Sequence, residues 1–163
     1  MALPTDFSAI ESADYSYLFY TRPNGAIAFL KSNTTHEDPD TKYSPSNVIS
    51  AGNTVEASVP RVSAVSYTLH GNREIRLYYI VKKAKGSGHQ LAELCQTNGG
   101  EWKPGVLNKN NVTCSEKSLI SANVENGQGD LKVFFMDPDG QPGVAWVTLG
   151  QTTWSQHLLD NSW

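Results

Sequence analysis

The segment EIRLYY at Glu74–Tyr79 is followed by QLAELC at Gln90–Cys95 and by EWKPG at Glu101–Gly105. In the first two segments, polar residues are interspersed with aliphatic and aromatic ones, which is typical of half-buried β-strands. The lysine-rich stretch at 82–85 lies between them and predicts a solvated hairpin tip. A further short segment, SAV at Ser63–Val65, precedes all three. This part of the chain therefore predicts an antiparallel sheet of four short strands.

The order of these four segments recurs along the whole chain. A serine-alanine pair comes first in each unit, and it recurs after 55 and 58 residues. The matching positions in the three units are Ser8, Ser63 and Ser121; Tyr17–Tyr20, Arg76–Tyr79 and Lys132–Phe135; Ala28–Leu30, Ala92–Leu94 and Ala145–Val147; and Tyr43, Trp102 and Trp154, each opening a fourth strand. Four correspondences in one order predict three repeats in a single domain of residues 1–163, at about 1–54, 55–112 and 113–163.

A repeat of this length with four antiparallel strands is typical of one propeller blade. No segment of the chain shows a helical apolar period longer than two turns, so helical solenoids are excluded. A β-sandwich of about twelve strands is an alternative, but it would not explain the repeat. The sequence predicts an all-β fold, a β-propeller with three four-stranded blades per chain.

Three blades do not close a propeller, which typically has four to eight. An open arc would expose the apolar faces of its first and last blades to water. A second copy of the chain can cover both faces at once, and two-fold symmetry is the commonest symmetry of oligomers. We therefore expect a homodimer that completes a six-bladed ring.

Composition excludes several kinds of partner. Of 163 residues 39% are hydrophobic and 18% are charged, and the net charge of −3 favours neither nucleic acid nor insertion into a membrane. The N-terminal residues lack a signal peptide, so we expect a cytoplasmic protein or one released without a signal. Cys95 and Cys114 are expected to be free thiols. No cofactor or metal site is expected, and the sequence at Asp137–Gly140 predicts a hairpin turn and not a calcium loop.

The motifs of the middle repeat resemble those of the fungal fucose-specific lectins of the Aleuria aurantia lectin type. The resemblance rests on Ser63–Val65, on Ile75–Tyr79 (IRLYY), on the apolar-x-Glu segment at Leu91–Leu94 and on GEWKPG at Gly100–Gly105. It implies a six-bladed propeller that binds fucose or fucosylated glycans in pockets between adjacent blades, without catalysis. The flanking repeats match this pattern in architecture more than in functional residues.

The resemblance also implies which side chains bind the sugar. In that family an arginine and a glutamate come from one blade and a tryptophan comes from the fourth strand of the next. Carried over, they are Arg76, Glu93 and Trp154. The arginine can donate two parallel hydrogen bonds to neighbouring hydroxyls, the glutamate accepts from hydroxyl protons, and the indole packs on C–H groups.

The other two repeats depart from the pattern. The first has Tyr17 and Phe29 at the arginine and glutamate positions, and the third is expected to have Lys132 and Trp146 there. Lysine lacks the planar fork of arginine, and an aromatic ring removes the acceptor. We therefore expect at most one complete pocket per chain. The further candidates for sugar binding are Trp102, Tyr43 and Lys132.

Two other functions stay open. A glycoside hydrolase needs two carboxylates about 5–10 Å apart across one pocket, and only Glu93 stands in the candidate pocket. We accordingly expect that the protein is not an enzyme. A propeller that mediates protein–protein contacts, with decayed sugar sites, is the other alternative, because two of the three repeats have lost the Arg/Glu pair.

Overall fold

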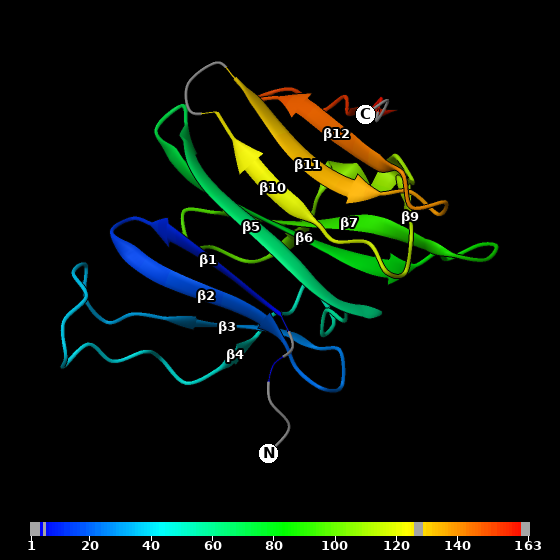
Figure 1. Ribbon diagram of the computed structural model, residues 1–163. Coiled ribbons are helices and arrows are strands. Elements are labelled where there is room, and N and C mark those ends of the chain that lie inside the picture. The colour runs from blue at the N-terminus through cyan, green and yellow to red at the C-terminus, as the bar shows by residue number, and fades with distance from the viewer. Residues whose placement is uncertain (1–3, 5, 126–128, 161–163) are drawn as a thin grey trace.

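The described strands of the chain form three separate antiparallel sheets (Figure 1). The computed structural model describes residue 4, residues 6–125 and residues 129–160. The first sheet contains β1 (Phe7–Ser12), β2 (Tyr15–Thr21), β3 (Ile27–Lys31) and β4 (Asn47–Val48) in that order. The second contains β5 (Val59–Leu69), β6 (Asn72–Lys82), β7 (His89–Thr97) and β8 (Lys103–Pro104), with β9 (Thr113–Cys114) also paired to β7. The third contains β10 (Ser121–Val124), β11 (Asp130–Met136), β12 (Pro142–Thr148) and β13 (Ser155–Leu158).

This architecture confirms the predicted all-β fold with three four-stranded blades. A short 3₁₀ helix, η1 (Val106–Lys109), and the extra strand β9 follow the fourth strand of the second sheet and have no counterpart in the prediction. The repeat boundaries at about residues 54 and 112 stay predictions, because pairing defines the sheets and not the linkers between them. No helix among the described residues is long and apolar enough to cross a membrane.

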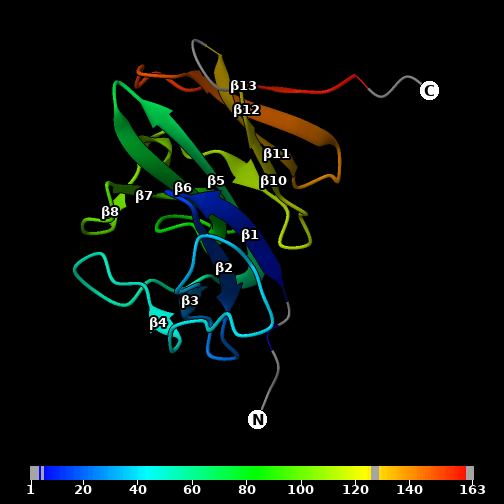
Figure 2. The same ribbon diagram turned by 90° about the vertical axis from the view of Figure 1, so that its left-hand side faces the viewer.

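The three sheets fan out from their first strands, and β1, β5 and β10 lie side by side in both views (Figures 1 and 2). A repeated hydrogen bond joins neighbouring sheets there. The Ala64 amide donates to the Ser8 hydroxyl, and the Ala122 amide donates to the Ser63 hydroxyl, both at 2.8 Å. The recurring serine-alanine pair of the sequence thus supplies the acceptor and the donor of the hydrogen bond that joins one sheet to the next.

Two apolar clusters fill the spaces between the sheets, and β6 contributes to both. Ile75, Leu77 and Tyr79 point toward the first sheet, where they pack in one cluster. Tyr78 and Ile80 point the other way, into the cluster shared with the third sheet. Because side chains alternate along a strand, β6 carries an apolar face on each side and is buried from both.

Several smaller predictions are confirmed. The stretch between β6 and β7 is a hairpin turn, and the turn at Asp137–Gly140 is closed by the Asp137 carboxylate, which accepts from the Asp139 and Gln141 amides. Cys95 and Cys114 are free thiols. Apart from these predictions, no group of three or more His, Cys, Asp or Glu among the described residues is placed to hold a metal ion; the expectation of no metal site stays a prediction.

The prediction for the fourth strand of the first sheet is wrong in where the strand begins and in its length. A strand opened by Tyr43 was expected, but β4 consists of Asn47–Val48 alone, and Tyr43 makes only an isolated bridge to Ser32. Pro45 interrupts this segment, and proline cannot donate to the ladder. The tryptophans of the other sheets directly precede β8 and β13.

The serine hydroxyl that joins the second and third sheets should contribute measurably to stability. We expect Ser63→Ala to lower the free energy of unfolding by about 1–3 kcal/mol, because Ser63 is buried and the Ala122 amide loses its acceptor. Urea denaturation measures the change. Ser66→Ala is the matched control, since the Ser66 hydroxyl donates to the backbone of Glu11 near the surface, where water can replace it. An equal loss in both variants would contradict the prediction.

Candidate functional site

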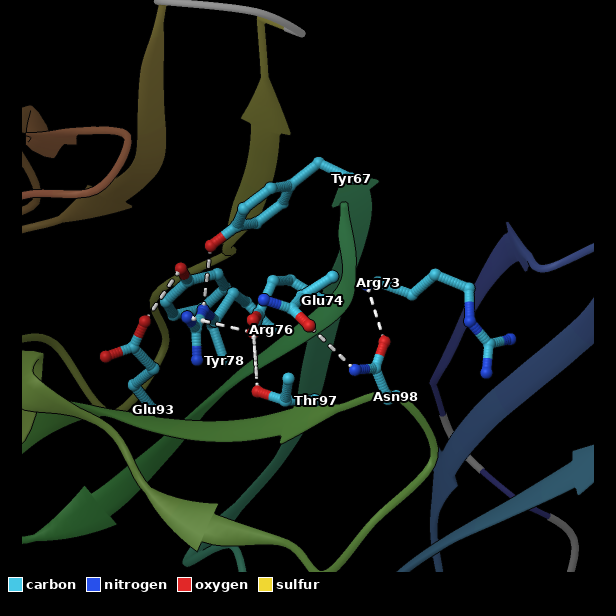
Figure 3. A network of polar contacts seen from close by, with 9 residues as sticks. Tyr67, Arg73, Glu74, Arg76, Tyr78, Glu93, Thr97 and Asn98 are labelled. Atoms are coloured by element: carbon cyan, nitrogen blue, oxygen red, sulfur yellow. Dashed lines mark hydrogen bonds and ion pairs between the residues drawn. The ribbon is translucent and has the colours of Figure 1, made fainter. Parts of the chain in front are cut away.

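Arg76 lies on β6 with its side chain on the face turned to the third sheet, and two neighbours fix its guanidinium (Figure 3). Its Nε donates to the Tyr67 hydroxyl at 3.0 Å. Its Nη2 lies 3.2 Å from Oε2 of Glu74. The ion pair of Arg76 is therefore with Glu74 on its own strand, and not with Glu93 across the sheet.

Glu93 lies on β7 directly opposite Tyr78, and the residue is buried, with 3% of its surface exposed. The Tyr78 hydroxyl donates to Oε1, and the Leu107 amide donates to Oε2, each at 3.1 Å. Burial raises the pKa of Glu93, while the Leu107 amide and the charge of Arg76 act in the opposite direction. The carboxylate is thus held in place and still has lone pairs for a ligand.

The segment at 105–109 builds the support for Glu93. Asn108 clamps the Glu93 backbone: its Oδ1 accepts from the Glu93 amide at 2.6 Å, and its Nδ2 donates to the Glu93 carbonyl at 3.1 Å. A Cβ at position 105 would lie 2.0 Å from Oε2 of Glu93, so only glycine leaves room for the carboxylate. The second glycine of the GEWKPG motif therefore has a steric role at the site.

Trp154 reaches the same place from the third sheet. It precedes β13 and is 7% exposed, with its ring edge-to-face with Tyr78 at 6.2 Å between centroids. The Asn110 side chain donates to the Trp154 carbonyl at 3.3 Å and so joins the η1 segment to the third sheet.

Arg76, Glu93 and Trp154 line one hollow of about 240 Å³ between the second and third sheets. Its other walls are Tyr67, Leu69, Cys95, Val106, Leu131 and residues 147–152. This volume is below the ~300–1,000 Å³ common for sites that take drug-sized ligands, which favours a small ligand. The structure thus brings together the three residues predicted to form the site.

Sequence reasoning missed Tyr67 as a lining residue. Tyr67 lies two positions after Val65 on β5, so it shares a face with the residue opposite Arg76. Its hydroxyl accepts from Arg76, which leaves its own proton for a ligand oxygen. Burial raises the pKa of Tyr67, so the hydroxyl stays protonated at neutral pH. The alternation of β5 was the signal that could have identified it.

Cys95 also lines the hollow, opposite Arg76 on the neighbouring strand. Burial raises the pKa of its thiol to about 12. The thiol is therefore protonated and a poor nucleophile at neutral pH.

The equivalent space between the first and second sheets is filled by aromatic rings. Phe29 stands opposite Phe19 as Glu93 stands opposite Tyr78, and Trp102 packs against both rings at 6.4 and 5.9 Å. Tyr17, at the position of Arg76, lies 5.9 Å from Phe29. The Trp102 indole nitrogen is buried and has no partner among the described residues. The role of Trp102 in sugar binding stays a prediction.

The third sheet corrects one predicted correspondence. Ser121 pairs with Phe134 as Ser63 pairs with Tyr78, so Lys132 does occupy the position of Arg76. The residue opposite Phe134 is Val144, however, and Trp146 lies opposite Lys132. Trp146 is therefore not at the glutamate position.

The remaining candidates lie away from the hollow. Lys132 is half-buried and points to the face of the third sheet opposite Leu131 and Val133, which pack on the second sheet. Tyr43 is exposed, and its hydroxyl donates to Glu37 at 2.9 Å. It lines a separate, open hollow with Tyr15, Phe29 and Lys31.

Comparison with known proteins shows similarity at the level of structure. No protein-family model matches the chain, and no curated protein matches its sequence. A crystal structure of a mutant of AofleA from Arthrobotrys oligospora superposes with a TM-score of 0.63 and 16% identity, over 93% of this chain and 40% of that one. A fucose lectin from Kordia zhangzhouensis in complex with methyl-fucoside superposes with a TM-score of 0.60 and 16% sequence identity, over 93% of this chain and 97% of that one.

A third solved structure is the Aleuria aurantia lectin, described as a six-bladed β-propeller with a novel mode of fucose recognition. It gives a TM-score of 0.54 and 21% identity, over 92% of this chain and 44% of that one. The chain thus spans less than half the length of the AofleA and Aleuria chains. These similarities show the fold: three blades, corresponding to half of a six-bladed propeller.

The buried carboxylate of Glu93 gives stability a particular dependence on pH. Because its pKa is raised in the folded state, that state retains the proton over a range in which the unfolded chain has lost it. Its contribution therefore favours the folded state at acidic pH and is lost as pH rises through the raised pKa. We therefore expect the free energy of unfolding of Glu93→Gln, relative to that of the unsubstituted protein, to be higher at pH 7 than at pH 4.5.

Chemical denaturation of both proteins at the two pH values measures this difference. The glutamine amide can still accept from Leu107 and donate to Tyr78, so the packing is matched. A stability difference that is the same at both pH values would show that the Glu93 carboxyl has no raised pKa.

Proposed function

We propose that this protein is a lectin that binds fucose or fucosylated glycans in the hollow between its second and third sheets, without catalysis. The observation that carries the proposal is the convergence of Arg76, Glu93 and Trp154 on one small hollow, with the guanidinium and the carboxylate both held by neighbours. The neighbouring folds described as fucose lectins support it.

The polar groups of the hollow are complementary to a neutral sugar. Arg76 keeps Nη1 for donation after Nε and Nη2 have engaged Tyr67 and Glu74. Glu93 accepts from hydroxyl protons beside it, since an ionised carboxylate has about four lone-pair sites and two are used within the chain.

The apolar walls suit the less polar side of a deoxy sugar. Leu69, Val106 and Leu131 line the hollow together with the Trp154 ring. A methyl group in place of a hydroxyl can enter such a wall without leaving a polar group unpaired. This favours a 6-deoxyhexose such as fucose over a fully hydroxylated hexose.

The arrangement of carboxylates favours binding without hydrolysis. Glu93 is the one carboxylate among the described residues that line the hollow. Glu74 is engaged by Arg76 and Thr97 and is not part of the lining. Glycoside hydrolysis in most families needs a second carboxylate across the scissile bond.

A homodimer that closes a six-bladed ring is part of the proposal. The outer face of the first sheet carries an apolar hollow of about 620 Å³, lined mainly by Phe7, Leu18, Tyr20 and Leu30. The outer face of the third sheet carries half-buried Phe134 and Trp146, with the His157 ring packed against Trp146 at 5.1 Å between centroids. Single exposed apolar side chains are ordinary, but two apolar sheet faces at opposite ends of one chain favour mutual burial.

The repeated serine bond fits the same arrangement. Ser8 and Ser63 each accept from an alanine amide of the following sheet, while Ser121 is exposed. In a closed ring the hydroxyl of Ser121 would meet the first sheet of a second copy, at Ala9. Closure would then give two complete pockets per dimer, and avidity for multivalent glycans would depend on both engaging together.

Sugar binding is tested by calorimetric titration with methyl α-L-fucoside. We expect saturable binding that Arg76→Ala and Glu93→Ala each weaken at least tenfold, because each removes a charged hydrogen-bonding group worth about 1.5–3 kcal/mol. Arg73→Ala is the matched control, since Arg73 does not line the hollow. Failure to bind fucosides or any member of a glycan array would favour the protein-contact alternative, and release of reducing sugar would indicate a hydrolase.

The ring is tested by light scattering coupled to gel filtration. We expect a mass twice that of one chain at micromolar concentration, and a shift toward monomer in Leu18→Asp, which places a charge in the apolar outer face of the first sheet. Leu119→Asp is the control, because Leu119 is exposed in the linker before β10. A folded, monodisperse monomer of the unsubstituted protein would refute the dimer.

A further inference from the structure

Glu74 is a buried acid beside the hollow whose contacts are all within the chain. It is 7% exposed and lies on β6 opposite Tyr67 on one side and Thr97 on the other. The Thr97 hydroxyl lies 3.0 Å from both carboxylate oxygens, and Arg76 lies 3.2 Å from one of them (Figure 3). Glu74 is absent from the lining of the hollow, so a ligand there would not touch it.

These contacts restrict the conformation of Arg76. An arginine side chain has several rotatable bonds, and a free one would lose its freedom on binding a ligand. Tyr67 holds Nε from β5, and Glu74 holds Nη2 from β6. Within the part of the chain that the structure describes, Nη1 has no oxygen partner, so its N–H groups can donate to a ligand oxygen. The Cys95 thiol is the further polar group beside the guanidinium.

We infer that Glu74 and Thr97 are positioning residues of the sugar site, which orient Arg76 before the ligand arrives. The inference rests on the proposed function of the hollow and adds residues that act through Arg76 and not on the sugar. Thr97 orients the Glu74 carboxylate, Glu74 and Tyr67 orient the guanidinium, and Nη1 is presented to the hollow.

The other two sheets show how these anchors accompany the arginine. By register, Ser12 and Tyr15 in the first sheet take the places of Tyr67 and Glu74, and the place of Arg76 is Tyr17. In this sheet, which lacks the arginine, both anchors are absent as well.

The third sheet keeps half of the arrangement. Asp130 lies opposite Thr148 as Glu74 lies opposite Thr97, and the Thr148 hydroxyl donates to Asp130 at 3.0 Å. Lys132 takes the place of Arg76, and no ion pair joins it to Asp130 among the described residues. The acid–threonine pair can therefore form without an arginine, and only the second sheet couples it to a guanidinium.

The test measures methyl α-L-fucoside affinity by calorimetry in Glu74→Gln, Thr97→Val and Thr97→Ser. We expect Glu74→Gln to weaken binding about five- to tenfold and Thr97→Val about two- to fourfold, while Thr97→Ser, which keeps the hydroxyl, restores nearly full affinity. Asp130→Asn removes the matching charge in the third sheet and is expected to leave affinity unchanged. Thermal denaturation of each variant shows whether it folds.

Two further readouts separate positioning from general stability. In an Arg76→Lys background, adding Glu74→Gln should change affinity less than twofold, because the side chain through which Glu74 acts is gone. Independently of any sugar, the ¹⁵N–¹H signal of Arg76 Nε should broaden or exchange faster in Glu74→Gln than in the unsubstituted protein.

The outcomes separate this inference from the proposed function. If the unsubstituted protein binds no fucoside, the proposed function fails, and the role of Glu74 in a sugar site fails with it. If it binds, but Glu74→Gln binds equally well with an unchanged Arg76 Nε signal, only the positioning role is refuted. An effect of Glu74→Gln that is equally large in the Arg76→Lys background would also refute it.

Discussion

Each sheet of this protein has two apolar faces, and one chain covers both faces only of the second sheet. Alternation along the strands forces this, because Leu77 and Tyr78 are both fully buried yet point to opposite sides of β6. The first and third sheets each have one face that no other described sheet covers. The deep burial of the middle sheet results from this constraint, and the proposed closure of a ring would satisfy it for the other two sheets.

The two spaces between the sheets have one backbone geometry and opposite contents. Between the first and second sheets, Phe29 and Trp102 complete an aromatic cluster that contributes to stability through burial. Between the second and third, Glu93 replaces the phenylalanine, and a buried carboxylate costs free energy unless it is hydrogen-bonded. Tyr78 and Leu107 supply those bonds. Both interfaces contain an apolar cluster that stabilises the fold, but only the interface between the second and third sheets also keeps a polar hollow, at a cost in free energy.

The repeat made the three sheets predictable, because position along a blade fixes which face a residue occupies. The convergence of Arg76, Glu93 and Trp154 was implied by the resemblance to the fucose-specific lectins, together with the repeat. Contacts that depend on loops were not predictable. The Asn108 clamp comes from a 3₁₀ turn that has no counterpart in the described parts of the other repeats. The error at Trp146 arose from a shorter hairpin in the third sheet, where five residues lie between Met136 and Pro142, against ten between the equivalent pair Ile80 and Leu91. Similar local sequence then matched two residues out of register.

A site built across an interface couples ligand binding to packing. Arg76 and Glu93 belong to the second sheet and Trp154 to the third, so a ligand held by all three binds only when the sheets are docked. Such a ligand stabilises the docked state by RT ln(1 + [L]/Kd), about 2.7 kcal/mol at a hundredfold excess over Kd. Linkage requires the converse as well, since whatever tightens the interface, from the Ser63 bond to closure of a ring, also raises affinity for the ligand. The stability of the interface between the two sheets and the affinity of the site for its ligand are therefore thermodynamically coupled.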